Sequence, residues 1–190
     1  MVKPLISILK SSTTLVMAAG IAFAAAPASA ENPMVGGAPM YETMNMVEDA
    51  VKSKDHTTLV AAVKAAGLVE TLASDGPFTV FAPVNDAFAA LPEGTVDTLL
   101  KPENKDMLVK VLTAHVAAGN WTGADIMAKA EENGGTWAFK AVSGDTLTAQ
   151  VQNGQLYIVD ENMNAAKVTI ADVIQSNGVI HVVNSVLVPK

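Results

Sequence analysis

The chain has 190 residues, half of them hydrophobic, and its 19 acidic residues outnumber its 12 lysines, which gives a formal net charge of −7. An acidic surface repels phosphate groups, and the sequence contains no arginine, the residue best suited to phosphate and guanine recognition. We therefore expect no nucleic acid partner and no attachment to an anionic membrane. Cysteine is also absent, so we expect an ordinary hydrophobic core, and the length suits one domain.

Residues 1–30 have the composition of a bacterial secretory signal peptide. Lys3 and Lys10 are the only charged residues in this segment, an apolar run covers residues 15–26, and small residues lead up to Ala30. The apolar run is too short to cross a bilayer, which needs about 20 residues. We predict cleavage after Ala30 and a mature protein in the periplasm or secreted from the cell, with no segment inserted in a membrane.

The next segment, residues 31–42, contains two prolines and two glycines without any periodicity, so we expect a flexible leader. A single domain is predicted over residues 43–189, and Thr43 is expected to cap its first helix. A second helix is predicted over residues 57–66. Its apolar residues share one face, and Gly67 stands where a helix commonly ends.

The strongest helical pattern covers residues 103–114, where apolar residues recur at a helical spacing and His115 follows on the same face. From residue 136 onward the spacing changes to two, which indicates strands. Two Asn-Gly dipeptides, at residues 153–154 and 177–178, predict two-residue hairpin turns. The predicted strands are residues 146–151, 155–159, 167–174 and 179–188. Helices come mostly before strands, which predicts an α+β fold with an antiparallel sheet.

The three histidines do not indicate a catalytic or metal site. His56 begins a helix and is expected to be exposed, whereas His115 and His181 lie among apolar residues and are expected to be buried and hydrogen-bonded. Zinc needs three or four converging ligands, and the sequence offers no cysteine and no clustered histidines. It also has no nucleophile motif and no glycine-rich phosphate loop, so we expect neither enzymatic activity nor a cofactor.

Methionines provide the one metal hypothesis with a chemical basis. Four of the nine lie near the predicted start of the mature chain, and thioethers bind Cu(I). Met46 is also required by the apolar face of the first helix, and methionine commonly fills gaps in hydrophobic cores. Copper binding is therefore an alternative that competes with ordinary packing. The four residues are Met34, Met40, Met44 and Met46.

Two segments far apart in the sequence carry a family resemblance. TVFAPVNDAF at residues 79–88 and NGVIHVVNSVLVP at residues 177–189 resemble the first and second signature motifs of the fasciclin domain family. VLTAHVAAG at residues 111–119 resembles the family's central histidine segment, and residues 55–72 resemble its first helices. The resemblance implies an α+β domain in which a wedge-shaped β-sandwich is flanked by a helical layer.

The residue types in the two motifs suit structural roles. Phe81 suits a buried strand, Pro83 ends a strand ladder, and Asn85 or Asp86 is able to cap the turn that follows. We therefore predict that the motifs build the fold. The residues with predicted structural roles are Thr79, Phe81, Pro83, Asn85, Asp86, Phe88, His115, Asn177, Gly178 and His181.

The resemblance implies a secreted or cell-surface interaction domain that acts through protein or carbohydrate contacts, and we expect a monomer or weak homo-oligomer. In animal members a Tyr-His pair is implicated in integrin binding. Here Ala114 stands at the tyrosine position before His115, so this activity is not expected, and Asn184 replaces the usual Asp of the second motif. Trp121 and Trp137 are the candidates for the contact surface, because large aromatic residues are common in binding hot spots. The alternative is a periplasmic binding protein for a small apolar ligand or Cu(I).

Overall fold

The computed structural model describes residues 32–190, and the predicted signal peptide lies outside them. No helix in this described part is long and apolar enough to cross a membrane. The helices are α1 (Met46–Ala50), α2 (Thr57–Ala66), α3 (Val69–Leu72), α4 (Asn85–Ala89), α5 (Thr95–Leu99), α6 (Lys105–Ala114) and α7 (Gly123–Glu132), with 3-10 turns η1 (Lys54–His56) and η2 (Pro102–Asn104). The strands are β1 (Met34–Val35), β2 (Ala38–Pro39), β3 (Phe78–Pro83), β4 (Val116–Ala118), β5 (Thr136–Lys140), β6 (Thr146–Gln152), β7 (Gln155–Val159), β8 (Ala165–Gln175) and β9 (Gly178–Val183).

The segment 31–42, predicted to be a flexible leader, forms regular structure over its described residues. Strands β1 and β2 pair as a short antiparallel hairpin, with Val35 opposite Ala38. The side chains of Val35 and Met40 are 3% and 2% exposed and belong to a hydrophobic core. The prediction of a flexible segment is therefore wrong from residue 32 onward, because prolines and glycines that interrupt a periodic pattern also build short turns.

Within the described residues, one seven-stranded sheet has the strand order β4-β3-β9-β8-β7-β6-β5. Neighbouring strands are antiparallel except β3 and β9, which run parallel with Phe81 opposite His181. The sequence predicted an antiparallel sheet, so this parallel pair is a correction. The sheet nearly closes on itself, because a bridge joins Ala117 on the edge strand β4 to Ala141, which follows the opposite edge strand β5.

Helices α2 and α6 confirm the two strongest helix predictions. α2 covers the predicted residues and ends at Gly67, which is left-handed with φ 74°. α6 begins at Lys105 instead of Glu103. Its buried face contains Leu108, Val111, Leu112 and Ala114. Apolar spacing therefore identified the faces that pack against the rest of the domain.

The predicted cap of the first helix is wrong. Asn45, and not Thr43, occupies the N-cap of α1, and its side chain accepts hydrogen bonds from the backbone N–H groups of Val47 and Glu48. The Glu48 side chain accepts from the backbone N–H of Asn45 in return. This reciprocal capping box starts the helix at Met46.

The two predicted Asn-Gly turns have different outcomes. Asn153-Gly154 joins β6 and β7 with φ angles of 52° and 73°, which confirms the first turn. In the second, Ser176-Asn177 forms the turn, and Gly178 already pairs with Gln175 as the first residue of β9. Glycine is required there, because an added Cβ would lie 1.9 Å from the carbonyl oxygen of Phe78 on β3.

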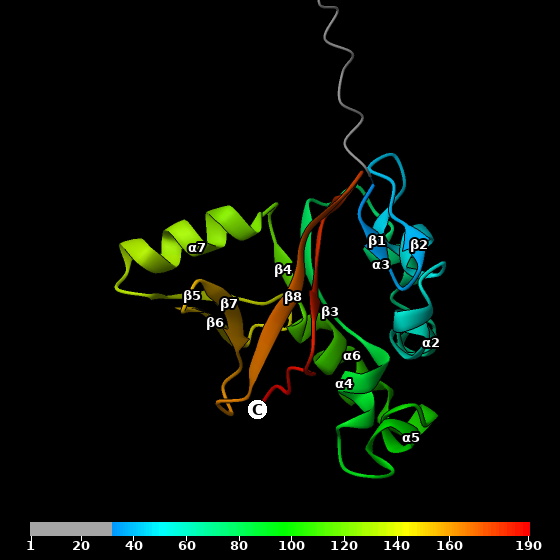
Figure 1. Cartoon of the computed structure of the whole chain (residues 1–190). Coiled ribbons are helices and arrows are strands. Elements are labelled where there is room, and N and C mark those ends of the chain that lie inside the picture. The colour runs from blue at the N-terminus through cyan, green and yellow to red at the C-terminus, as the bar shows by residue number, and fades with distance from the viewer. Residues whose placement is uncertain (1–31) are drawn as a thin grey trace, which may run out of the picture. The chain divides into compact units, whose positions relative to one another are not determined.

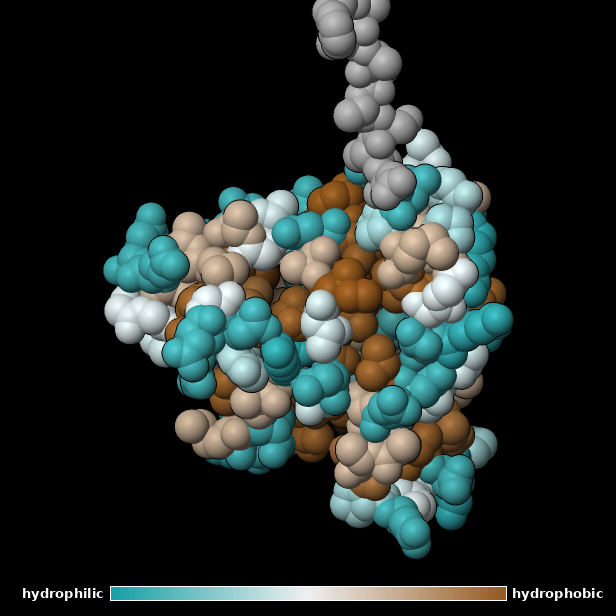
Figure 2. All heavy atoms as spheres, viewed as in Figure 1, coloured by the Kyte–Doolittle hydropathy of each residue, from teal (hydrophilic) through white to brown (hydrophobic). Residues whose placement is uncertain are grey.

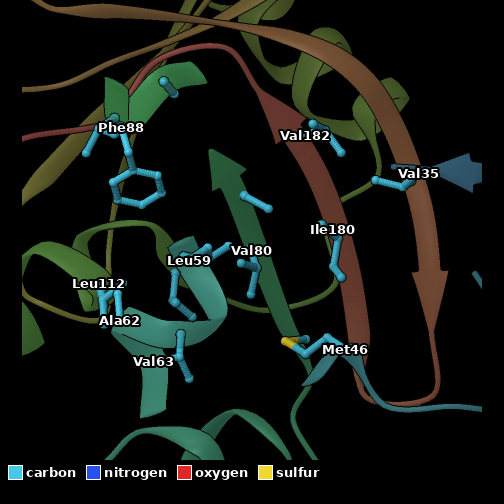
Figure 3. Close-up of a cluster of buried hydrophobic side chains, with 14 of the residues drawn as sticks. Val35, Met46, Leu59, Ala62, Val63, Val80, Phe88, Leu112, Ile180 and Val182 are labelled. Carbon is cyan, nitrogen blue, oxygen red and sulfur yellow. The ribbon is translucent and has the colours of Figure 1, made fainter. Parts of the chain in front are cut away.

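Two hydrophobic cores share the central strands. On β3, Val80 and Ala82 belong to the core beneath the helices, whereas Phe81 belongs to the core enclosed by the curved sheet and α7. Figure 3 shows Leu59 of α2 and Ile180 of β9 in the first of these cores, next to Val80. Helix α7 packs on β5 and β6, and the other helices lie on the far side of β3 (Figure 1). These elements confirm the predicted α+β class.

The surface gives little direct indication of a contact site. The face shown in Figure 2 mixes hydrophilic and hydrophobic residues, and hydrophobic residues reach the surface in its middle and at several places along its edge. Scattered apolar surface is normal for soluble domains. Specific side chains, and not a broad surface patch, therefore indicate the candidate functional site.

Candidate interaction site

The two tryptophans singled out from the sequence lie side by side. Trp121 lies between β4 and α7, Trp137 lies on the edge strand β5, and both are partly buried. Their ring centroids are 5.2 Å apart and their planes meet at 64°, an edge-to-face pair. The ammonium group of Lys129, from α7, lies over both rings, 5.3 Å from the centre of Trp121 and 5.4 Å from that of Trp137. We call these three residues the aromatic corner.

The aromatic corner continues as a column of rings, through the partly buried Phe139 into the buried rings of Phe81 and His181. Phe139 stacks on Trp137 with centroids 4.9 Å apart, and Phe81 lies 5.9 Å from Phe139. The imidazole of His181 stacks on Phe81 at 5.7 Å. Because Phe81 and His181 are fully buried, this column anchors a partly exposed surface feature in the core of the sheet.

The peptide groups of Trp121 are held by one residue from each signature segment. Thr79 accepts a hydrogen bond from the Trp121 N–H through Oγ1 (2.9 Å) and donates one to the carbonyl of Gly119 (2.8 Å). His181 Nε2 donates to the carbonyl of Trp121 (2.9 Å). The indole Nε1–H of Trp121 donates to the carbonyl of Ala118 (3.0 Å). Both the backbone and the ring of Trp121 are therefore fixed.

Hydrogen bonds define the protonation state of His181. Its Nδ1 accepts from the backbone N–H of Asp172 (3.3 Å), so the single proton of the neutral ring is on Nε2. Burial lowers the pKa of His181, although the Trp121 carbonyl and the Asp172 carboxylate act in the opposite direction. The Asp172 carboxylate accepts from the N–H of Gly123 (2.6 Å) at the start of α7. This network connects β8, β9 and α7 next to the aromatic corner.

Sequence reasoning did not single out Lys129 or Phe139. Phe139 follows Trp137 at a spacing of two, and this spacing is the signal that could have placed both rings on one face of a strand. Lys129 gave no such signal, because a lysine in the last turn of a helix is explained by the helix dipole alone. Only the packing of α7 on β5 brings it to the tryptophans.

His115 has a structural environment. It is 2% exposed, its Nδ1–H donates to the carbonyl of Val111 (2.8 Å), and its Nε2 accepts from the backbone N–H of Leu187 (2.8 Å). Burial lowers the pKa of His115 to about 4. Ala114, at the tyrosine position of the animal Tyr-His pair, is 1% exposed. Neither side chain of this pair is therefore presented to a partner.

His56 was predicted to be exposed, and this prediction is wrong. The ring is 3% exposed and lies with Val35 and Met40 around a small cavity of about 20 Å³. Its Nδ1 forms a hydrogen bond with Ser53 Oγ (2.9 Å), and burial lowers its pKa. The polar neighbours of His56 in sequence suggested exposure, whereas the N-terminal hairpin covers the ring.

In the first signature segment, Asn85 has a role different from the predicted one. Val84 is the N-cap of α4, and no side chain forms a cap hydrogen bond there. Asn85 Oδ1 instead accepts from the backbone N–H of Thr58 (3.0 Å) in the first turn of α2, and its Nδ2 donates to the carbonyl of Lys54 (2.8 Å). Asp86 is exposed. The buried members of this segment include Thr79, Phe81, Pro83 and Phe88.

Asn177, in the second signature segment, connects the sheet to the helical side. Its Oδ1 accepts from the backbone N–H of Met46 (3.1 Å) at the start of α1. Its Nδ2 donates to the carbonyls of Leu72 (2.7 Å) and Ser74 (2.9 Å). Asn184, which replaces the usual Asp, keeps the acceptor role through a hydrogen bond from the backbone of β8 (2.8 Å). These asparagines hold the fold together.

The methionines of the copper hypothesis differ in their exposure to solvent. Met40 and Met46 are 2% and 3% exposed in the helical core, whereas Met34 is 58% exposed. Met44 accepts a hydrogen bond from Lys52 through its sulfur. Across residues 32–190, no group of three or more His, Cys, Asp or Glu residues is placed to hold a metal ion.

The mixed helical and sheet architecture, with its two central motif strands, defines a class of small α+β domain. The sequence model of the Fasciclin domain matches residues 54–189, and the chain therefore belongs to the fasciclin domain family. This result confirms the family resemblance of the two signature segments.

Similar proteins come from bacteria and animals. Protein sll1483 of Synechocystis sp. is 47% identical over 169 residues, which cover 89% of this chain and 87% of that protein. Immunogenic protein MPB70 of Mycobacterium bovis is 31% identical, with 90% of each chain covered. Transforming growth factor-beta-induced protein ig-h3 of Sus scrofa is 37% identical over 77% of this chain but only 20% of its own length.

A solved structure confirms the fold class. The FAS1 domain pair from the insect cell adhesion molecule fasciclin I matches with a TM-score of 0.67, covering 76% of this chain and 50% of that chain. The sequence identity is 18%, so this likeness shows the fold alone.

Proposed function

We propose that this protein is an exported, non-enzymatic interaction module that associates with a protein or carbohydrate of a bacterial surface or matrix. The aromatic corner of Trp121, Trp137 and Lys129 is its contact site. The observation that carries the proposal is the convergence of Thr79 and His181 on the peptide groups of Trp121. Both signature segments thus contribute a buried polar side chain that fixes one partly exposed tryptophan.

A fixed tryptophan is well suited to binding. Tryptophan is enriched in binding hot spots, and a ring that is already ordered loses little conformational entropy when a partner arrives. The column from Trp137 to Phe139 and Phe81 provides this order on the second side of the corner.

The comparisons support the same class of function. The structurally similar insect protein is described as a cell adhesion molecule. The predicted signal peptide supports export to the periplasm or beyond, and the excess of acidic residues favours a monomer or weak homo-oligomer through mutual repulsion. The same charge disfavours nucleic acid as a partner.

Retention on cells tests the proposal. Fluorescently labelled protein lacking residues 1–30 is added to cells of the producing bacterium that lack the gene, and bound fluorescence is measured. The variant Trp137→Leu is expected to lower retention at least about tenfold, as for a hot-spot residue. Met163→Ala, which changes a residue that is 77% exposed, is the matched control and should bind like the parent. Equal retention of the parent and Trp137→Leu would exclude the aromatic corner as the contact site.

A second candidate function, binding of a small apolar ligand, is favoured by a cavity between the helices and the sheet. The cavity has a volume of about 50 Å³, and its lining is apolar apart from Lys64 and His115. An apolar cavity of about 150 Å³ binds benzene, so this one takes only a smaller group unless neighbouring side chains move. Native mass spectrometry of the protein from the exporting cell tests this candidate. A retained ligand mass supports it, and an empty protein supports the interaction module.

A further inference from the structure

Within the aromatic corner, the two tryptophan rings already hold a cation, the Lys129 ammonium. The distances from the Lys129 ammonium to the two tryptophan ring centres, 5.3 and 5.4 Å, nearly equal the 5.2 Å between the rings themselves. Both contacts lie within the range in which the negative face of an aromatic ring attracts a positive charge. The two rings therefore form a cation-binding corner whose occupant in the free protein is a side chain of the same chain.

The occupant is held only weakly by other groups. The ion pairs found between residues 32 and 190 are Lys52–Asp49 and Lys110–Asp145, and neither involves Lys129. Asp125 lies one turn earlier on α7 and attracts the Lys129 ammonium, but the two side chains form no ion pair, and the Asp125 carboxylate accepts hydrogen bonds from the N–H and hydroxyl of Thr122. Lys129 is also absent from the side-chain hydrogen bonds of α7. Its ammonium can therefore return to water without breaking an ion pair.

We propose that the corner of Trp121 and Trp137 binds a quaternary ammonium group, which takes the place of the Lys129 ammonium. This inference builds on the proposed function and specifies the chemistry of the partner. A quaternary ammonium has no N–H groups to leave unsatisfied, whereas the compact ammonium of lysine is strongly hydrated and favours return to water. The exchange thus keeps a cation on the two rings and restores the hydration of Lys129.

The charge around the corner favours the same ligand. Helix α7 carries three acidic residues against one lysine, its C-terminal end has a partial negative charge, and the whole chain has a formal net charge of −7. The acidic residues of α7 are Asp125, Glu131 and Glu132. Long-range attraction therefore concentrates cations at this surface and repels anions.

Lys129 provides a direct test, because its removal should strengthen binding. The variant Lys129→Gln empties the corner, and we expect it to bind choline at least about fivefold more tightly than the parent. The chain has two tryptophans, so their indole N–H signals in NMR spectra report on the corner during a titration with choline chloride at constant ionic strength. A dissociation constant for Lys129→Gln no lower than that of the parent would overturn the proposal.

Two controls separate the cation contact from other effects. Lys101→Gln removes the same charge from an exposed residue outside α7 and should show no gain in affinity. The neutral analogue 3,3-dimethyl-1-butanol has the shape of choline without its charge and should not bind more tightly to Lys129→Gln. An equal gain in choline affinity for Lys101→Gln would indicate a general electrostatic effect, and an equal gain for the neutral analogue would indicate apolar contact. Either result would overturn the proposal.

The double variants Lys129→Gln/Trp137→Leu and Lys129→Gln/Trp137→Phe test the rings. The leucine variant should lose saturable choline binding. The phenylalanine variant keeps an aromatic face and a similar fit in the fold, so it should remain folded and bind choline with intermediate affinity. Undiminished choline affinity in the phenylalanine variant would count against binding at the two tryptophans.

If Lys129→Gln gains choline affinity while retention on cells does not depend on Trp137, the proposed function fails and this site remains. If Lys129→Gln gains no choline affinity while retention on cells depends on Trp137, the choline site fails and the proposed function remains.

Discussion

His181 on the last strand donates a hydrogen bond to the carbonyl of Trp121, although the two residues lie 60 positions apart in the sequence. Thr79 holds the N–H of the same residue from the neighbouring strand β3. The position of the tryptophan on the surface therefore depends on two side chains that are themselves 0% exposed. A change at either buried residue is expected to alter the geometry of the proposed contact site.

The substitution Thr79→Val tests this dependence. It preserves the shape of the side chain but leaves the Trp121 N–H and the Gly119 carbonyl without their partner. We expect the free energy of unfolding, measured with urea, to fall by about 1–3 kcal/mol. Thr148→Val on β6 is the control, since its hydroxyl makes no side-chain hydrogen bond to the strands beside it, and should change stability by less than about 0.5 kcal/mol. Equal losses in both variants would contradict the role of Thr79.

Asn85→Ala should destabilise the protein through helix α2. The alanine removes the acceptor for the Thr58 N–H and the donor to the Lys54 carbonyl, and loss of such a cap costs about 0.5–2 kcal/mol. Thermal unfolding measures the effect. The exposed neighbour Asp86, changed to Asn, should shift the melting temperature far less. A melting curve of Asn85→Ala identical to that of the parent would refute the capping role.

Gly178→Ala should prevent normal pairing of β3 with β9. The added Cβ would meet the Phe78 carbonyl oxygen at 1.9 Å, and φ at this residue is 153°. We expect a loss of at least about 3 kcal/mol in the free energy of unfolding, or no folded protein, which circular dichroism would detect. Gly144→Ala is the matched control, because its φ of 92° is also unfavourable to alanine but nothing lies within 4 Å of the added Cβ. Similar losses of stability in Gly178→Ala and Gly144→Ala would show that the backbone angle φ, and not the contact with Phe78, causes the effect.

Acid should destabilise the fold through His115. Its pKa is about 4 in the folded protein, below the ordinary 6.5, so the folded state resists a proton that the unfolded chain accepts. The stability is fully present above pH 6.5 and is lost as the pH falls towards 4, by about 3 kcal/mol from this residue. Urea unfolding at pH 7 and pH 4.5 measures the loss in the parent and in His115→Gln. His115→Gln should be less stable than the parent at pH 7, but it should lose less stability between pH 7 and pH 4.5. Equal losses of stability in the two proteins over this range would contradict this explanation.

Local patterns predicted the parts of the fold that are determined by neighbouring residues. Helix α2, helix α6 and the β6–β7 hairpin follow from apolar spacing and from one Asn-Gly turn. The burial of His56 and the parallel pairing of β3 with β9 depend on segments distant in sequence, so no local spacing indicated them.

The candidate site was predictable residue by residue but not as an arrangement. Trp121 and Trp137 were recognised because large aromatic residues are common in binding hot spots. Their mutual contact and the position of Lys129 result from the packing of α7 on β5, which spacing along the chain does not encode.

The parallel pairing of β3 with β9 also determines when the chain can fold. Residues 78–83 lie beside residues 178–183, so the centre of the sheet is incomplete until residues 178–183 are available. Contacts between such distant segments form slowly, because a long loop must first be closed. A chain that emerges from a ribosome beginning with its N-terminus therefore cannot complete its core early. A chain that ends before Gly178 leaves β3 and β8 without their common neighbour.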